Sequence, residues 1–210
     1  IFQSQLFNAQ YINCLNFVIE GGSIESDGKG TLLTTSECLL SPNRNGAWNK
    51  DQIEQYLKEN LGISRILWLD HGFLEGDDTL ARFCPHDTIV YVQYNDPKDR
   101  HYKALKDMES QLQSFRTQDN RPFRLLPLPM ADEIVFDNER LPATYANFLI
   151  INGAVLYPTY NQPINDSRTA EILTTAFPER QIIGIDCRAL IKQHGSLHCV
   201  TMQYPKNVIK

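Results

Sequence analysis

The stretch GTLLTTSECLLSPNRNGAWNKDQIEQYLKENLGISRILWL (residues 30–69) contains the unit from which the rest of the chain is built. Its start, together with INCLNFVIEGGSIE (12–25) before the turn-forming SDGKG, is rich in β-forming residues and predicts a hairpin. The middle part, NKDQIEQYLKENLG, has apolar residues at helical spacing, with Asn49 or Asp51 as candidate N-cap and Gly62 just past its end. ISRILWL then follows as a short buried strand. The stretch therefore predicts the order strand, strand, helix, strand.

This order recurs twice further along the chain. After the extended HGFLEGDDTLARF (71–83), the runs TIVYVQY, DPKDRHYKALKDMESQLQSF and FRLLPLPM predict a strand, a helix and a strand. TYANFLII and AVLYPTY, joined at Asn152-Gly153, form a predicted hairpin that precedes the helical DSRTAEILTTAFP and the strand QIIGIDC (181–187). A further unit opens at Leu197. The predicted fold class is therefore α/β, built from repeated modules.

Repeated modules of this size often cannot bury their own apolar faces and need neighbours, as in a solenoid or a propeller. We therefore expect an α/β ring, whose axis would be lined by loops from several modules and would be a natural ligand site. An ordinary open α/β sheet is the alternative that the pattern leaves open.

Composition limits the classes of function. The chain has 210 residues, 42% of them apolar, with 20 Lys and Arg against 25 Asp and Glu, a formal charge of −5. This balance disfavours nucleic acid or an anionic membrane as the main partner and mildly favours a cationic ligand. No apolar run reaches the ~20 residues that span a bilayer. Five widely spaced cysteines, an odd number, indicate reduced thiols in a cytoplasm, and the missing initial Met indicates that the chain begins within a gene product.

The C-terminal HGSLHCVTMQY (194–204) places Cys199 between a Gly-Ser loop and a run that predicts a strand. This cysteine could be a buried filler, a metal ligand or a nucleophile, and the junction favours the nucleophile because a reactive thiolate must be partly exposed. A metal site is disfavoured, because His194, His198 and Cys199 have no second ligand pair. In a strand His198 would point away from its neighbour's sulfur, so a base must come from elsewhere. His194 is a candidate by distance alone, and the remaining histidines are expected at the surface: His71, His86 and His101.

Carboxylates at the ends of two predicted strands form a second candidate group. Glu20 begins EGGSIESDG, and LEGDDT holds Glu75, Asp77 and Asp78 beside a glycine. Such residues commonly form turns, but both groups occupy the same place in their module, so a ring would direct both towards its axis. Several carboxylates around one site would bind a guanidinium or ammonium group. Asn147, in TYANF, could present its amide to a ligand or only bridge backbone groups in a turn.

The segments EGGSIESDGKGTLLTTSECLLSPNRN, LGISRILWLDHGFLEGDDT, TYANFLIINGAVLYPTYN and GSLHCVTMQYP, in this order, resemble the agmatine deiminase branch of the guanidine-modifying superfamily, the relatives of bacterial peptidylarginine deiminase. The resemblance covers nearly the whole chain. It implies a pentein-type α/β propeller of repeated strand-strand-helix-strand modules. Residues 1–210 would then be a partial propeller catalytic domain, with about three modules and the closing part of another.

The resemblance also implies chemistry. Cys199 would attack the guanidinium carbon of agmatine, ammonia would leave, and water would hydrolyse the covalent S-amidino intermediate to N-carbamoylputrescine, without a cofactor or a metal. Glu20, Asp77 and Asp78 would hold the cationic substrate, and Asn147 would lie near its reacting end. A cytoplasmic enzyme of polyamine and putrescine biosynthesis is implied, with neither nucleic acid nor membrane as a partner and with homo-oligomerisation left open.

The sequence departs from the family pattern at one point. The family's Gly-His-x-Asp or Ser-His-x-Asp stretch, which supplies the general acid and base, should follow the aspartates, but here Thr79 runs directly into Leu80. We interpret residues 1–210 as joined pieces of a longer polypeptide, so the position of the catalytic histidine stays open. Arginine or peptidylarginine deimination is the alternative reaction. A catalytically inactive propeller that binds a cationic metabolite or a protein is the alternative class.

Overall fold

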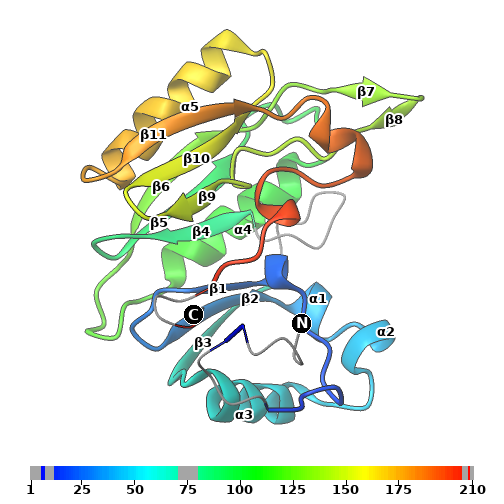
Figure 1. Ribbon diagram of the computed structural model, residues 1–210, viewed down its shortest axis with the longest axis vertical. Coiled ribbons are helices and arrows are strands. Elements are labelled where there is room, and N and C mark those ends of the chain that lie inside the picture. Colours follow the sequence, from blue (N-terminus) through cyan, green and yellow to red (C-terminus); the bar gives the residue numbers. More distant parts are fainter. Residues whose placement is uncertain (1–5, 8–11, 71–79, 205–207, 209–210) are drawn as a thin grey trace.

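The structure is a computed structural model that describes residues 6–7, 12–70, 80–204 and 208. Within them, three three-stranded sheets follow one another along the long axis of the molecule (Figure 1). In each sheet the first pair of strands is antiparallel, the second pair is parallel, and helical segments connect the parallel pair. The predicted order strand, strand, helix, strand is therefore confirmed for three modules.

The first module (24–69) contains the predicted hairpin and helix. Its elements are β1 (Ile24–Ser26), β2 (Thr31–Thr35), α1 (Ser36–Leu39), α2 (Pro42–Asn45), α3 (Lys50–Leu61) and β3 (Arg65–Leu69). The Asn49 side chain accepts a hydrogen bond from the Gln52 N–H, and the Gln52 side chain accepts one from the Asn49 N–H. Gly62 ends α3 with a left-handed φ of 64°. These two residues are the N-cap and C-cap that the pattern predicted.

Two predicted extensions of the first hairpin are wrong. Residues 12–19 form no strand, and SECL after β2 forms the helix α1 instead of continuing the strand. Asn45 accounts for part of the first difference, because its side chain accepts a hydrogen bond from the Val18 N–H at 2.9 Å and donates one to the Val18 carbonyl at 2.8 Å. A side chain therefore satisfies backbone groups that a neighbouring strand would otherwise satisfy.

The second and third modules repeat the arrangement. The second (81–129) has β4 (Ala81–Cys84), β5 (Thr88–Gln93), α4 (Tyr102–Ser114) and β6 (Arg124–Pro129), and the third (149–186) has β9 (Leu149–Ile151), β10 (Ala154–Thr159), α5 (Pro163–Ala176) and β11 (Gln181–Asp186). A small hairpin, β7 (Val135–Phe136) and β8 (Glu139–Arg140), lies between them in the chain. Ile151 lies opposite Ala154, which confirms the predicted two-residue turn.

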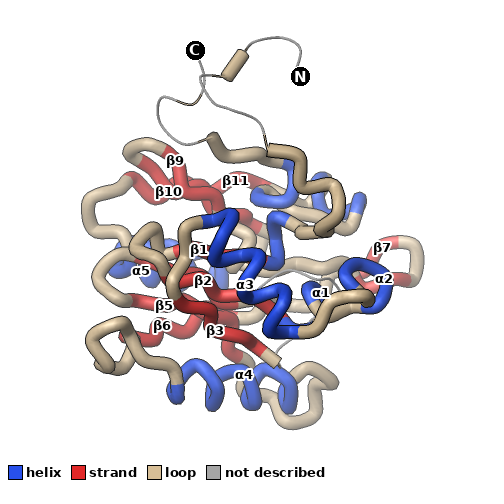
Figure 2. The backbone as a smooth tube through the Cα atoms, turned by 90° about the horizontal axis from the view of Figure 1, so that it is seen from below, coloured by secondary structure: helices blue, strands red, loops and turns tan. Residues whose placement is uncertain are grey.

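Each later helix packs on its own sheet and on the last strand of the module before it. Helix α4 contacts β5 and also β3, and α5 contacts β10 and β11 and also β6. Figure 2 shows α3 and α4 on the outside of the strands. The shared packing gives a large apolar core that includes Leu69 of β3, Val90 of β5, Leu128 of β6 and Val155 of β10. A second, smaller core lies within the first module and includes Ile53 and Leu57 of α3. The modules therefore bury their apolar faces against one another, as the repeat predicted.

The C-terminal segment differs from its prediction. It forms two short 3₁₀ helices, η3 (Leu190–Gln193) and η4 (His198–Val200), and residues 201–204 form no strand. The Thr201 N–H and hydroxyl both donate to the His198 carbonyl, at 3.0 and 2.8 Å, which closes η4 as a helical turn. The predicted strand after Cys199 is therefore wrong, and the opening of another module at Leu197 stays a prediction. In the described part of the chain, no helix has the length and apolarity needed to cross a membrane.

Candidate active site

Cys199 lies in the middle of η4 and is exposed to solvent. Cys38 and Cys187, by contrast, are completely buried. The filler interpretation therefore does not hold for Cys199, because a cysteine that only fills the core is among the most buried residues of a protein. Its exposure meets the first requirement for a reactive thiol.

The Asn147 side chain lies against the Cys199 sulfur. Asn147 precedes β9 and is only 6% exposed. Its Nδ2 donates to Cys199 Sγ at 3.0 Å, and its Oδ1 accepts a hydrogen bond from the His198 N–H at 2.7 Å. The backbone N–H can only donate, so Oδ1 faces His198 and the NH₂ group faces the sulfur. An N–H donor at this place favours the negatively charged thiolate over the neutral thiol.

A buried phenol joins the two segments that carry Asn147 and Cys199. The hydroxyl of Tyr160, which directly follows β10, donates to the Thr144 carbonyl at 3.0 Å and lies 3.2 Å from the hydroxyl of Ser196. Ser196 is 1% exposed and precedes η4 by two residues. Burial raises the pKa of Tyr160 well above its usual range, so the phenol stays neutral and can donate. Tyr160 thus links Thr144, three residues before Asn147, to Ser196, three residues before Cys199, and so helps to hold the two side chains in contact.

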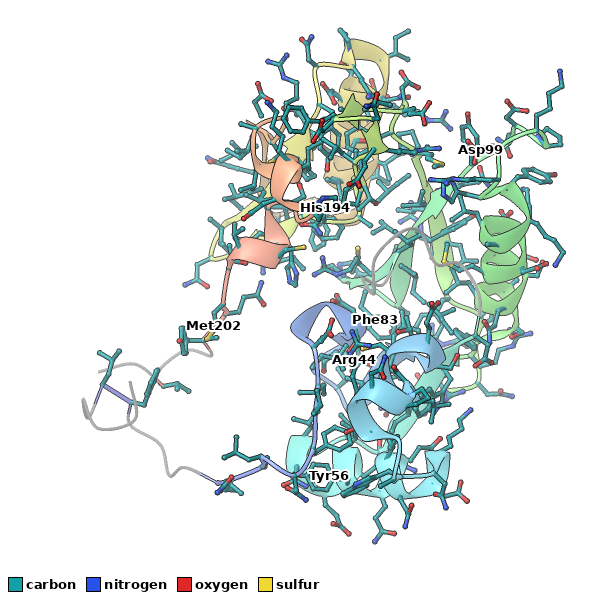
Figure 3. The ribbon with its side chains drawn as sticks, turned by 90° about the vertical axis from the view of Figure 1, so that its right-hand side faces the viewer. Arg44, Tyr56, Phe83, Asp99, His194 and Met202 are labelled. Carbon is teal, nitrogen blue, oxygen red and sulfur yellow. The ribbon has the colours of Figure 1, made fainter. Side chains whose placement is uncertain are left out.

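The segment after Glu20 lies beside η4. It forms the 3₁₀ helix η2 (Gly21–Ser23), in which the Ser23 N–H and hydroxyl both donate to the Glu20 carbonyl, at 3.1 and 2.8 Å. Helices η2 and η4 contact each other, although they come from opposite ends of the chain (Figures 1 and 3). The structure therefore brings the loop of Glu20 to the helix of Cys199, as a site at the meeting point of modules requires.

The Glu20 carboxylate is paired with Arg44 of α2. Arg44 Nε donates to Glu20 Oε1 at 2.7 Å, and the Arg44 terminal nitrogen contacts the same oxygen. The Glu20 side chain is 44% exposed, so the pair lies at the surface of the site. The NRNGAW stretch was expected to be a turn without a chemical role, and nothing in its pattern indicates this pairing. The contact shows that the Glu20 carboxylate accepts a guanidinium in this position.

A second guanidinium–carboxylate pair is buried between the first two modules. Arg82 of β4 donates from Nε to Glu25 Oε2 of β1 at 2.7 Å, and the two side chains are only 8% and 12% exposed. Burial raises the pKa of Glu25 above 4.5, although Arg82 and the Phe83 N–H act in the opposite direction. Sequence reasoning missed this pair, because Glu25 and Arg82 resemble ordinary charged residues in short exposed strands.

Glu25, Arg82, Asn147 and His198 line one small hollow together with glycines of η2. It has room of about 20 Å³, which is close to the space that one water molecule needs. The hollow is therefore too small for a substrate, and Cys199, which is exposed, does not line it.

The described histidines lie in three kinds of surroundings. His194 Nε2 is 3.7 Å from the Glu139 carboxylate of β8, and both side chains are largely exposed. His101 is buried against Asp99 at 2.9 Å, which corrects its expected place at the surface, and burial lowers its pKa below 6.5. His86 lies exposed in the β4–β5 turn. The reason given for excluding His198 is wrong, because η4 is not a strand.

Four predicted residues lie outside the described residues: His71, Glu75, Asp77 and Asp78. Of the predicted site residues, the structure therefore places Cys199, Asn147 and the loop of Glu20 together. Among the residues that the structure describes, no group of three or more His, Cys, Asp or Glu side chains could hold a metal ion.

Comparison with known proteins gives a consistent result. The family model of the Porphyromonas-type peptidyl-arginine deiminases matches residues 2–205. A Porphyromonas gingivalis protein provisionally named arginine deiminase has a crystal structure with a TM-score of 0.90 and 55% identity, over 93% of this chain and 59% of that one. A C. jejuni agmatine deiminase, as a cysteine-to-serine variant with substrate bound, has a TM-score of 0.84 and 41% identity, over 91% and 57%.

Among curated relatives, a Vibrio parahaemolyticus protein provisionally named agmatine deiminase is 37% identical over 211 residues, which are 90% of this chain and 58% of that protein. The Pseudomonas fluorescens agmatine deiminase is 32% identical over 90% of this chain and 57% of its own length. The chain therefore spans less than two thirds of the length of the relatives that it matches.

Proposed function

We propose that this chain, which belongs to the Porphyromonas-type peptidyl-arginine deiminase family, carries the nucleophile of an enzyme that hydrolyses agmatine to N-carbamoylputrescine and ammonia. One observation carries the proposal. An exposed cysteine has an amide N–H donor 3.0 Å from its sulfur, at a place where two distant loops meet. An activated thiolate in contact with a hydrogen-bond donor is the arrangement that nucleophilic catalysis by cysteine needs.

The proposed reaction has two steps. The Cys199 thiolate attacks the guanidinium carbon, a C–S bond forms, and a C–N bond breaks as ammonia leaves after its nitrogen has taken up one proton from solvent water. Water then attacks the same carbon and releases two protons to solvent, a C–O bond forms, and the C–S bond breaks to regenerate the thiolate. Asn147 stabilises the sulfur at the beginning and end of this cycle, when it carries negative charge. No electron transfer takes place, and the proposed steps include no cofactor.

The cationic substrate would be held by carboxylates. Glu20 supports this role, because its carboxylate already accepts the guanidinium of Arg44 and its loop contacts η4. We assign the same role to Asp77 and Asp78 on the family resemblance. One similar structure is provisionally named arginine deiminase and another is named agmatine deiminase. Both names support a guanidino substrate. Arginine or peptidylarginine is therefore the alternative substrate.

A catalytically inactive protein that binds a cationic metabolite or another protein is a second candidate. One observation favours it: the sequence runs from Asp78 and Thr79 directly into Leu80, without the histidine that the resemblance implies. Loss of a general acid and base costs about 10²–10⁴ in rate. Such a protein would bind agmatine without releasing ammonia at a useful rate.

Two further proposals concern the whole protein. We propose that the three modules are part of a propeller-type ring, because α4 and α5 each pack on the last strand of the preceding module. We also propose a cytoplasmic location, because none of the five cysteines forms a disulfide.

The test is ammonia release by the full-length protein with agmatine, arginine and a peptidylarginine as separate substrates. We expect turnover with agmatine, its loss in Cys199→Ala, and its retention in the control Cys14→Ala. Turnover that survives Cys199→Ala contradicts the proposed mechanism. Binding of agmatine without ammonia release supports the inactive protein instead.

A further inference from the structure

We propose that Arg82 is a positioning residue: its guanidinium holds the backbone on both sides of Asn147 and so keeps the Asn147 amide against the Cys199 sulfur. The inference rests on the proposed function for its effect on turnover, but its effect on the sulfur can be measured separately.

The Arg82 guanidinium contacts two different parts of the chain. Its Nε donates to Glu25 of β1, in the first module, at 2.7 Å. Its Nη1 donates to the carbonyls of Ala146 and Phe148, before the third module, at 3.1 and 2.9 Å. The guanidinium carbon also lies 4.7 Å from the centre of the Phe148 ring. One side chain of the second module therefore links the first module to the segment that leads into the third.

The two carbonyls that Arg82 binds flank Asn147. Ala146 comes directly before Asn147 and Phe148 directly after it, so Arg82 Nη1 binds the backbone on both sides of this residue. The carbonyl of Asn147 itself accepts the His198 N–H of η4 at 3.3 Å. Arg82 thus holds the neighbours of Asn147 while the helix of Cys199 bonds Asn147 itself.

The chemistry of this position requires an arginine. Nη1 carries two N–H groups, which can serve two carbonyls at once, and Nε serves Glu25 in the same plane. A lysine ammonium is a point charge without this fork, so it could keep the charge of the Glu25 pair but not both carbonyl bonds. Because the Arg82 side chain is only 8% exposed, water is poorly placed to replace them. Arg82→Lys therefore tests the bonds to the two carbonyls while it keeps a positive charge beside Glu25.

The test measures alkylation of Cys199 by iodoacetamide in the full-length protein, as a function of pH, with peptide mapping to identify the cysteine. We expect Arg82→Lys to slow the reaction roughly tenfold near neutral pH, as loss of a hydrogen bond to a charged group would, and to move its acid limb to higher pH. The control Arg140→Lys alters a guanidinium that pairs with Asp99 at 3.6 Å and should leave the profile unchanged.

A double-variant comparison separates positioning from a general structural effect. If Arg82 acts through Asn147, adding Arg82→Lys to Asn147→Ala should cause no further loss of alkylation rate. Equal losses in both backgrounds, or a wild-type rate in Arg82→Lys, would overturn the inference. If Arg82→Lys does not fold, Glu25→Leu/Arg82→Met, which removes both charges at similar volume, replaces it. Failure of both to fold would also overturn the inference, since the role of Arg82 would then be structural.

Turnover distinguishes the inference from the function on which it rests. Alkylation that depends on Arg82 and Asn147, in a protein that releases no ammonia from agmatine, leaves the inference standing and removes the proposed function. Turnover of agmatine by an Arg82→Lys variant with an unchanged kcat removes the inference alone. An unchanged KM with a lower kcat is the expected result, because Arg82 reaches the reacting atoms only through Asn147.

Discussion

Replacing Asn147 tests directly whether its amide stabilises the Cys199 thiolate. Asn147→Ala removes the N–H donor 3.0 Å from the sulfur and the acceptor 2.7 Å from the His198 N–H. A hydrogen bond to a charged group contributes about 1.5–3 kcal/mol, so the loss should lower thiolate reactivity about 10- to 150-fold. Asn147→Asp keeps the shape and the acceptor for His198 but places an anion beside the sulfur.

The aspartate variant should be the worse of the two. Two unit charges 3.0 Å apart repel each other by about 5 kcal/mol at an effective dielectric constant of 20. This is an upper bound, because Cys199 is exposed and solvent screens the repulsion. We therefore expect the order wild type, Asn147→Ala, Asn147→Asp in both the rate of iodoacetamide alkylation and the rate of ammonia release, at a pH where the aspartate is ionised.

Alkylation rates of purified full-length variants, followed by intact mass and checked against their melting temperatures, give the measurement. An aspartate variant that reacts as fast as the alanine variant, while both remain folded, would refute the role of the amide as a donor. Equal rates for all three proteins would show that the contact between Asn147 and Cys199 has no influence on the sulfur.

Three other predictions follow from the same geometry. A Cβ at Gly195 would lie 3.1 Å from the Cys199 Cβ and 3.7 Å from its sulfur, so Gly195→Ala should displace η4 and slow alkylation of Cys199; an unaltered rate would contradict the packing. Burial raises the pKa of the Cys84 thiol to about 12, so Cys199 should be alkylated well before Cys84 at mildly alkaline pH. Peptide mapping after limited alkylation measures the order, and the reverse order would be inconsistent with the burial of Cys84. Because the pKa of Glu25 is raised, the folded protein binds a proton more readily than the unfolded chain just above pH 4.5, so the free energy of unfolding should fall as pH rises through that window. Glu25→Gln should remove this part of the pH dependence of the free energy of unfolding, measured by urea titration at several pH values. An unchanged pH dependence would argue against it.

Much of the fold could be predicted because its local patterns are strong. Asn49 and Gly62 mark both ends of α3 by their own chemistry, and Asn152-Gly153 determines a turn that admits one register. These features depend only on neighbours in the sequence. The later start of α4 has a local cause as well, since the Asp99 carboxylate accepts the His101 N–H at 2.8 Å and forms a turn within the predicted helix.

The C-terminal segment was misjudged because its partners are distant in the sequence. VTMQY has the composition of a strand, but η4 is determined by the Asn147 side chain, fifty-one residues before His198. The pairs of Glu25 with Arg82 and of Glu20 with Arg44 are likewise contacts between separate elements. No periodicity in the sequence indicates which charge will meet which. The candidate site could therefore be predicted by residue type and by resemblance, but its supporting contacts could not.

The most direct test of the account is the intact mass of the full-length protein, quenched with acid during reaction with agmatine. We predict a species heavier than the free protein by agmatine minus ammonia, with the added mass on the peptide of Cys199 and absent from Cys199→Ala. Ammonia release without any such species, together with turnover in Cys199→Ala, would contradict the account.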